Sequence, residues 1–482
     1  MSTPKPSLSI ITESVVLDVP APTFTGAPLF PLPSAETIHL APNVQLQPPL
    51  TRCGKGPGLL IVVPSLCSAA DVNLAEVNEA NLPETISSKS LDPPPLQKWA
   101  EEGYCVLQLE YKAESEVNEA EWGIEKVLEE GVETLKGRVE CTGKRLGLIV
   151  YEPAVLDKLL LGILSYPSFC CLVTYGSSWE EPSIPTLQHL PANDPKAASV
   201  ANTLVDDGTV ETGQKNATHG SGTATPAVPI KSFLYPCDSP YFPLPNRAGE
   251  TEKEYSSHAA AVAHSRTLEF LKMPQLLSGP VFALETLWEE HCYYEFEERK
   301  VDKIMAAEPY VNHVPTMAGG AGRTALTAFY RDHFVNCNPI DTQLHLVSRT
   351  IGIDRVVDEF VATLTHDQEI DWLLPGVPPT GKHLEIPTVA IVCFRGDRLC
   401  SEHIHWDQAT VLKQLDLLTS HFPCPSSASP ASSSSSGGVQ PLIRLPVCGK
   451  EAAQKLVGGE GGVVGGQRPG NKEKDDKEKE DK

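Results

Sequence analysis

Between residues 58 and 272, short apolar runs alternate with helical patterns, and this alternation constrains the fold more than any other feature of the chain. The runs lack a regular polar alternation, so we expect both faces of each strand to be buried. Such strands, separated by helices, are typical of a mostly parallel sheet covered by helices. The predicted strands are 59–63, 104–109, 146–150, 169–175, 185–190 and 231–235, and the predicted helices are 96–102, 116–136, 155–164 and 259–272.

A different pattern begins near residue 279. Two helices are predicted at 285–305 and 324–334. After them, hydrophobic residues no longer recur at helical spacing but at every second position, as in a strand. Strands are predicted at 343–351, 355–366, 385–394 and 399–407, with hairpin turns at 352–354 and 395–397 and a last helix at 409–418. Helices followed by antiparallel strands indicate an α+β domain.

The chain of 482 residues is therefore divided into two folded units with less regular ends. We predict an extended N-terminal arm over residues 1–50 and an α/β domain over 51–278 with a mobile insertion at 202–229. The α+β domain spans 279–422. Residues 423–482 are predicted to be a low-complexity linker and a disordered charged tail.

Charge and cysteine content narrow the function classes. The formal net charge of −23 disfavours binding to nucleic acid and to anionic membrane surfaces. The 13 cysteines include no Cys-x-x-Cys pair, which favours reduced thiols and a cytoplasmic protein over a zinc site. The first residues show no secretory signal pattern.

The first domain resembles the dienelactone hydrolase (carboxymethylenebutenolidase) family of α/β hydrolases. The resemblance lies in the layout of residues 58–272, above all in residues 96–109 (LQKWAEEGYCVLQL) and 231–272. It implies an α/β-hydrolase-like parallel sheet with a Gly-x-Cys-x-Gly nucleophile turn after the strand 146–150, a later acid and a histidine.

The residues at the implied catalytic positions differ from that pattern. Glu152 stands where the family has its cysteine, Pro240 stands at the place of the histidine, and Asp194 could stand for the acid. One hypothesis is a repurposed hydrolase led by the Glu152 carboxylate. The favoured one is a pseudoenzyme scaffold in which Glu152 is an ordinary acid at a helix start.

The second domain resembles the SnoaL-like branch of the NTF2-like fold, in the version fused to dienelactone-hydrolase-like domains in fungi. The segments that carry the resemblance are LWEEHCYYEFEERKVDKIM, EPYVNHVPTMAGGAGR, FYRDHF, SRTIGIDRVVDEF, THDQEIDWLLPGVPPTGK and RGDRLCSEHIHWDQATVLKQL. The resemblance implies a cone-shaped α+β barrel around a pocket, cofactor-free cyclase or isomerase chemistry or ligand binding alone, and a possible homodimer through the sheet.

Ionisable residues on the predicted strands suggest where proton transfer could occur. Period two places His403, His405 and Asp407 on one face of the last strand, and Glu402, Ile404 and Trp406 on the other. We predict a catalytic set that also contains Glu359 and His313, the latter in a loop. A strand face with several ionisable groups in a pocket suits acid–base catalysis.

Arginines and aromatic residues complete the predicted site. Arg323, Arg349 and Arg355 could bind an anion or an enolate, and Trp372, Trp406 and Tyr310 could line the pocket. The alternatives are ordinary: Arg349 and Arg355 could pair with aspartates across the hairpin, the tryptophans could be core, and His403, His405 and Asp407 could hold a metal. We predict no metal and no cofactor.

Three functions stay open at this point. The first is acid–base chemistry on a small carbonyl or polyketide-like compound in the second domain. The second is residual ester or lactone hydrolysis in the first domain. The third is non-enzymatic ligand binding or dimerisation.

Overall fold

The computed structural model of the chain describes residues 31–65, 90–111, 121–156, 168–177, 183–195, 230–245, 254–296, 305–423 and 442–458. They form two compact units, one of Pro31–Leu287 with the turn Phe394–Leu399, and the other of Trp288–Cys393 with the chain from Cys400 onward. The predicted insertion at 202–229, most of the predicted linker and the charged tail lie outside the described residues. None of the described helices is long and apolar enough to cross a membrane.

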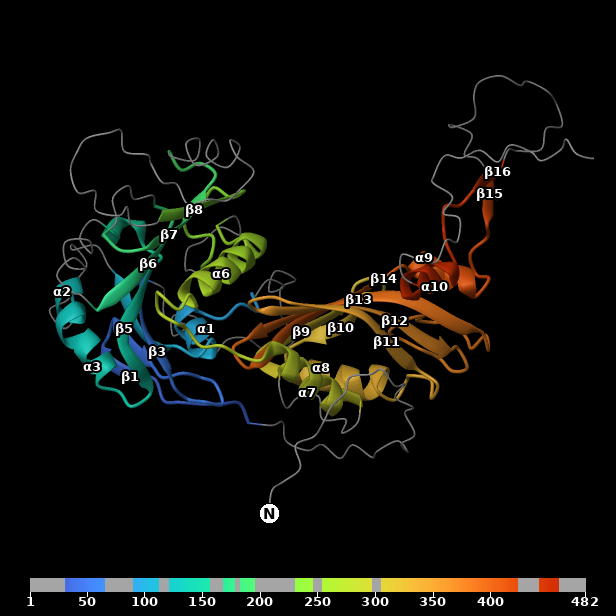
Figure 1. The fold of residues 1–482 in the computed structure, drawn as a ribbon, viewed down its shortest axis with the longest axis horizontal. Helices are drawn as coiled ribbons and strands as arrows, with labels where there is room; N and C mark the ends of the chain where they lie inside the picture. Colours follow the sequence, from blue (N-terminus) through green and yellow to red (C-terminus); the bar gives the residue numbers. More distant parts are fainter. Residues whose placement is uncertain are drawn as a thin grey trace, which may run out of the picture. The chain divides into compact units, whose positions relative to one another are not determined.

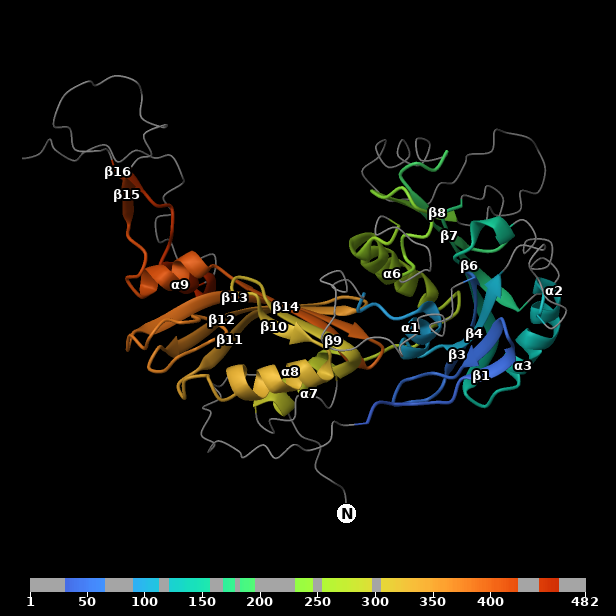
Figure 2. The same ribbon diagram turned by 180° about the vertical axis from the view of Figure 1, so that it is seen from behind.

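The first unit contains an eight-stranded sheet in the order β1-β2-β4-β3-β5-β6-β7-β8 (Figures 1 and 2). From β4 onward all neighbours are parallel, whereas β2 pairs antiparallel with both β1 and β4. The strands are β1 Ile38–Ala41, β2 Val44–Gln47, β3 Gly56–Pro64, β4 Cys105–Tyr111, β5 Cys141–Val150, β6 Phe169–Tyr175, β7 Thr186–Pro191 and β8 Ile230–Tyr235.

Helices cover both faces of this sheet. The helices α1 and α6 lie on one face and α2 and α3 on the opposite face (Figure 1). Their bounds are α1 Pro95–Glu101, α2 Ile124–Lys126, the wider turn η5 Val127–Gly131, α3 Val132–Lys136, the short turn η6 Pro153–Val155 and α6 Ser257–Leu271. All nine residues of β3 are buried, as expected for a central strand covered on two sides.

The prediction of an irregular arm over residues 1–50 is wrong for residues 38–47, which form β1 and β2. Each of these strands has only four residues, too few for a clear period-two pattern. They are stabilised by pairing at the sheet edge, where Val44–Gln47 lies against Val106–Leu109 of β4. Tertiary pairing thus outweighs the weak local sequence preference.

The second unit contains a six-stranded sheet in the order β10-β9-β14-β13-β12-β11. The pairs β10–β9, β11–β12 and β12–β13 are antiparallel. The helices α7 and α8 cover one face, called the inner face below, and α10 lies on the other side of the sheet (Figure 1). The strands are β9 Met305–His313, β10 Ala318–Ala321, β11 Gln343–Ile351, β12 Arg355–Thr365, β13 His383–Arg395 and β14 Arg398–Trp406. The other elements are α7 Leu284–Phe296, α8 Arg323–Phe329 continued by η8 Tyr330–Phe334, α9 Gln408–Gln414, α10 Glu451–Val457 and the short pair β15 His421–Pro423 and β16 Leu442–Arg444.

Two predictions in this unit need correction. The helix predicted at 285–305 cannot reach its last residue, because Met305 already begins β9. His313 is the last residue of β9 rather than a loop residue, and it pairs with Ala318 of β10. The glycine-rich sequence of β10 and the proline in β9 hide this hairpin from propensity arguments.

Candidate functional site

Burial alternates along β14 and distinguishes its two faces. Glu402 and Trp406 are buried on the inner face, whereas His403 is half-buried and His405 is exposed on the outer face. The same division holds on β12, where Asp358 is buried and Glu359 is half-buried. On β12 and β14 the inner face therefore presents Asp358 and Glu402, rather than His403 and His405, to α7 and α8.

The inner face carries a buried ionisable cluster formed by His291, Glu295 and Glu402. His291 Nε2 lies 3.0 Å from Glu402 Oε1 and 3.6 Å from Glu295 Oε2. The exposed fractions are 0% for His291, 4% for Glu295 and 3% for Glu402. Tyr330 donates its hydroxyl hydrogen to Glu402 Oε2 at 3.3 Å. Helix α7 supplies two of these groups because positions 291 and 295 are one turn apart.

Burial and charge set the protonation of this cluster. Burial raises the pKa of Glu295 to about 8; His291 lowers it in part, and Glu402 raises it further. Burial by itself lowers the pKa of His291, but the carboxylates of Glu402 and Glu295 raise it above its ordinary value. At neutral pH Glu295 therefore keeps its proton, and an acid held protonated beside a histidine is a group that acid–base chemistry can use.

Several buried polar atoms of the inner face have no hydrogen-bond partner. Within the described part of the chain these include His291 Nδ1 and Thr327 Oγ1, and Thr327 lies one helical turn before Tyr330. Leaving such atoms unsatisfied costs about 1–3 kcal/mol each.

A second network holds α7 against the sheet. Trp288 donates its indole N–H to Asp358 Oδ2 at 2.7 Å, and Arg349 donates to the two oxygens of Asp358 at 2.7 and 2.8 Å. Arg349 also donates to Glu289 at 3.3 Å. The Trp288 ring stacks on the His291 ring, with centroids 5.5 Å apart and planes at 15°. Asp358 thus fixes the indole that packs against the imidazole of the cluster.

Aromatic residues form the wall beside the cluster. His313 lies at their centre, with ring centroids 5.2–6.1 Å from those of Phe329, Phe334, Trp372 and Trp406. Its Nδ1 lies 3.2 Å from the carbonyl oxygen of Ala318. Burial lowers the pKa of His313 to about 4, so its ring is neutral at physiological pH. A neutral imidazole among aromatic rings suits a flat, partly apolar ligand.

The remaining predicted catalytic residues lie apart from the cluster. His403 packs edge-on against Tyr310, with centroids 5.7 Å apart. Asp407 follows β14 and caps α9 by accepting hydrogen bonds from Ala409 N at 3.0 Å and Thr410 Oγ1 at 2.6 Å. The prediction that Asp407 continues the strand face is therefore wrong, because its carboxylate turns back to the start of a helix.

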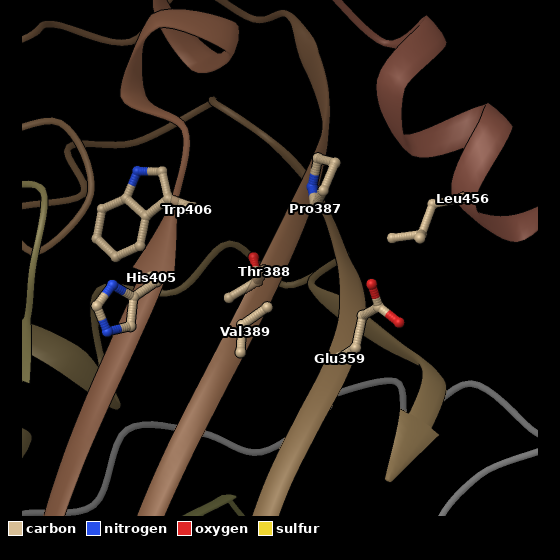
Figure 3. A pocket seen from close by; sticks show the side chains of 7 residues that line it. All are labelled: Glu359, Pro387, Thr388, Val389, His405, Trp406 and Leu456. Carbon is tan, nitrogen blue, oxygen red and sulfur yellow. The ribbon is translucent and has the colours of Figure 1, made fainter. Parts of the chain in front are cut away.

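Glu359 and His405 share a hollow on the outer face (Figure 3). The hollow is open, has a volume of about 240 Å³, and is also lined by Pro387, Thr388, Val389, Trp406 and Leu456. Ser348 donates its hydroxyl hydrogen to Glu359 at 3.0 Å.

The predicted arginines have separate environments. Arg349 is 9% exposed in its side chain and is part of the Asp358 network. Arg355 is 35% exposed and lies 3.2 Å from Asp354. Arg323 begins α8 after Gly322, whose φ of +81° fits the turn into the helix. Arg349 contacts α7 through Glu289 and also the Asp358 carboxylate on the inner face.

In the first unit, Glu152 lies at the expected place after β5 but not in a strained turn. Its φ of −105° and ψ of 101° are those of extended backbone, and it caps η6 by accepting a hydrogen bond from Ala154 N at 3.0 Å. A hydrolase nucleophile instead sits on a sharp, strained strand-to-helix turn. Tyr241 donates its hydroxyl hydrogen to Glu152 at 3.2 Å. This environment is that of a capping acid.

The other two hydrolase positions lie in turns. Asp194 is half-buried after β7, and its backbone N–H donates to Pro191 O at 3.1 Å. Pro240 packs directly against Gly176. A Cβ added at Gly176 would lie 2.1 Å from the Pro240 Cβ, so the contact requires glycine at position 176.

Aromatic residues fill the sheet near these positions. The rings of Tyr151 and Tyr175 stack at 4.7 Å, and those of Tyr175 and His189 stack at 4.6 Å. His189 is fully buried and has both ring nitrogens paired, with Tyr235 Oη at 2.8 Å and Thr267 Oγ1 at 2.9 Å. Burial, with a smaller effect of Arg266, lowers its pKa to about 3. His189 is therefore a neutral core histidine.

Comparison with known proteins finds similarity to solved structures only over part of the chain. No family model and no curated protein matches the sequence. A proposed SnoaL-like polyketide cyclase from Jannaschia sp. CCS1 is 19% identical, over 29% of this chain and 99% of its own, with a TM-score of 0.24. IdmH from Streptomyces antibioticus, a proposed polyketide cyclase, is 22% identical over 28% of this chain and 99% of its own, with a TM-score of 0.23. A protein with a ketosteroid isomerase-like fold from Catenulispora acidiphila DSM 44928, in complex with trimethylamine, is 15% identical over 31% of this chain and 100% of its own, with a TM-score of 0.22.

Sequence analysis did not single out His291, Glu295 or Tyr330, and it assigned Glu402 to the face opposite the proposed site. One pattern in the sequence could have found the inner face. Glu402 shares its strand face with Ile404 and Trp406, and an apolar partner set marks the buried side of a strand.

Proposed function

We propose that the inner face of the second unit binds a small, partly apolar carbonyl or polyketide-like compound and moves a proton on it without a cofactor. The observation that carries this proposal is the buried His291–Glu295–Glu402 cluster, in which the imidazole of His291 lies within 3.6 Å of both acids. Polar groups are buried at this density mainly where they have a function, because their desolvation is costly.

The groups can divide the proton transfer between them. Glu402 accepts a proton from the substrate carbon next to the carbonyl. The electron pair of the broken C–H bond stays on the substrate, which becomes an enolate. Glu295, protonated because its pKa is raised to about 8, donates a hydrogen bond to the enolate oxygen. Return of the proton from Glu402 to another carbon gives an isomer. Attack of the enolate carbon on a second carbonyl of the same molecule instead closes a ring, and the alkoxide formed from that carbonyl takes the proton back from Glu402. His291, with its Nε2 3.0 Å from Glu402 Oε1, holds that carboxyl in place.

The ring of aromatic residues around His313 supports a flat substrate. Trp372 and Trp406 meet at right angles with centroids 5.6 Å apart, and both contact His313. The cluster residues are at most 4% exposed, and exclusion of water strengthens their electrostatic interactions. We infer that a substrate enters when the wall opens.

The outer-face residues predicted from sequence are not part of this proposal. His403, His405 and Glu359 lie on the other side of the sheet from α7. We propose the inner acids as catalytic groups in their place, with Arg349 acting through Asp358.

A ligand-binding measurement tests the site directly. We expect bicyclic or tricyclic aromatic ketones to raise the melting temperature of the full chain, because a ligand that binds only the folded state stabilises it. The Glu402→Gln variant should need about tenfold more ligand, or a still higher concentration, to reach the same shift, since a charged hydrogen bond contributes about 1.5–3 kcal/mol. Glu359→Gln, on the outer face, is the matched control. Equal shifts in the two variants would count against the inner face.

Ligand binding without catalysis is the second candidate function for this unit. The observation that favours it is the closed packing, since His291, Glu295 and Glu402 are at most 4% exposed. A melting shift with no proton exchange on the same ketone would select this alternative.

For the first unit we propose a hydrolase-like scaffold without hydrolase chemistry. Its sheet order, in which β2 runs antiparallel to both of its neighbours and the later pairs are parallel, supports the resemblance to α/β hydrolases. The extended backbone at Glu152, the proline at position 240 and the bonded core histidine His189 argue against a working triad. Hydrolysis of a chromogenic ester that disappears in Glu152→Gln would overturn this.

A further inference from the structure

Two adjacent cysteines, Cys170 and Cys171, lie in β6 where its pairing with β5 is irregular. Leu146 of β5 pairs with Phe169, but the next residue of β5 pairs with Cys171. Cys170 is therefore an extra residue in β6, as in a β-bulge. In a regular strand two successive side chains point to opposite faces of the sheet, and the bulge interrupts that alternation at the two cysteines.

The two thiols of this bulge are close together. The Sγ atoms of Cys170 and Cys171 lie 3.9 Å apart. The sulfur atoms of a disulfide are about 2.05 Å apart, so the two thiols are about 2 Å from bonding distance. Adjacent Cα atoms are only about 3.8 Å apart, below the usual range for a disulfide, which makes a bond between neighbouring cysteines easy to reduce again.

Burial and hydrogen bonding give the two thiols different properties. Cys170 is half-buried, whereas Cys171 is 0% exposed. A hydrogen bond with the Cys171 thiol, together with the charge of Arg145, lowers the pKa of Cys170 to about 7 against the effect of its burial. The same hydrogen bond and burial raise the pKa of Cys171 well above its ordinary value. Cys170 is therefore the thiolate that a reagent reaches first, and Cys171 is a protonated thiol beside it.

The backbone around Arg145 holds its charge near Cys170. Arg145 donates a hydrogen bond to the carbonyl oxygen of Gln275. The N–H of the next residue, Leu146, donates to the carbonyl oxygen of Ser168 at 2.8 Å, which ties this part of β5 to the chain just before Cys170. A guanidinium at this place stabilises the ionised form of the Cys170 thiol.

We propose that Cys170 and Cys171 form a reversible oxidation site for hydroperoxides. The Cys170 thiolate attacks the terminal oxygen of the hydroperoxide, the O–O bond breaks, and the alkoxide or hydroxide that leaves takes a proton from water. The Cys171 sulfur then attacks the sulfur of the Cys170 sulfenic acid, the S–O bond breaks, and hydroxide leaves with the Cys171 proton as water. Two electrons pass from the two sulfurs to the peroxide, and a dithiol reductant returns them. This reaction does not rest on the function proposed for the second unit.

Mass spectrometry of the full chain after brief exposure to hydrogen peroxide, with free thiols then alkylated, tests the proposal. One tryptic peptide, residues 159–196, contains these two cysteines and no other. We expect this peptide to lose two hydrogen atoms on oxidation and to regain them with dithiothreitol. Cys337→Ser, which removes a half-buried thiol of the second unit, is the matched control and should leave the loss unchanged.

Variants of the site separate the two steps. Cys171→Ser should leave Cys170 as a sulfenic acid that dimedone traps, whereas the wild-type chain should take up little dimedone. Arg145→Leu should slow the oxidation of Cys170 at pH 7 about fivefold, because the thiolate fraction falls, and Arg145→Lys should restore the rate. The proposal is overturned if the wild-type peptide keeps both thiols, if Cys170→Ser still reacts at Cys171, or if the disulfide forms only in chain unfolded with urea.

Discussion

Glu402 and His403 are neighbours in sequence, yet one is buried with two ionisable partners and the other packs against Tyr310 on the far face of the sheet. The alternation of the strand could be predicted from sequence, because successive side chains point to opposite faces. The number of ionisable groups favours the face with His403 and His405 as the side toward a pocket. The apolar residues Ile404 and Trp406 were the better guide, since burial of apolar surface decides the orientation of a strand.

Glu295 allows a pH prediction at the scale of one residue. Its folded-state pKa of about 8 lies above the ordinary 4.5, and that of His291 is also raised. Both groups bind protons more tightly in the folded state, so their contribution is complete at low pH and is lost as pH rises toward and through 8. Glu295→Gln, which resembles the protonated acid, should therefore reduce the fall in melting temperature between pH 6 and pH 9. An unchanged fall would show that Glu295 is ionised in the folded protein. Glu359→Gln serves as the control.

The hairpin β11–β12 shows what a sequence can reveal about elements. Its first strand was predicted with its observed bounds, because alternation and a turn sequence agree over residues 343–354. The end of α7 and the strand β9 were missed. In the charged stretch after Glu295 the sequence fits helical spacing and strand alternation equally well, so the end of the helix cannot be placed. His313 is assigned to a strand by its pairing with Ala318 of β10.

The contact between α7 and the sheet supports a stability prediction at the scale of elements. Asp358→Ala removes the acceptor for both Trp288 and Arg349 and leaves a guanidinium that is 9% exposed without its main partner. We expect a loss of about 3–5 kcal/mol in the free energy of unfolding, the range for breaking a buried ion pair. Glu359→Ala, one residue further on the outer face, should cost about 0.5 kcal/mol or less. Chemical denaturation of both variants measures the difference, and similar losses would contradict the proposed role of Asp358.

At the scale of the whole molecule, the sequence distinguishes two kinds of unit because their hydrophobic periods differ. Continuous apolar runs predict the parallel pairings from β4 to β8, and period two predicts the antiparallel hairpins of the second unit. The short strands β1 and β2 are not predicted from the sequence, since four-residue strands depend on pairing with their neighbours. The sequence predicts the candidate site only in part, because the ionisable groups of the site come from α7, η8 and β14, which are distant in sequence.

The most direct test of the central claim is hydrogen exchange on a bound ketone by the full chain. We predict that the wild-type chain accelerates loss of the α-hydrogen NMR signals of 2-tetralone and related aromatic ketones in D₂O. Glu402→Gln should reduce this rate at least about a hundredfold, as expected for loss of a general base. Glu359→Gln and Glu152→Gln should leave it unchanged. Equal rates in wild type and Glu402→Gln, or a loss of exchange in Glu152→Gln alone, would contradict an acid–base site on the inner face of the second unit.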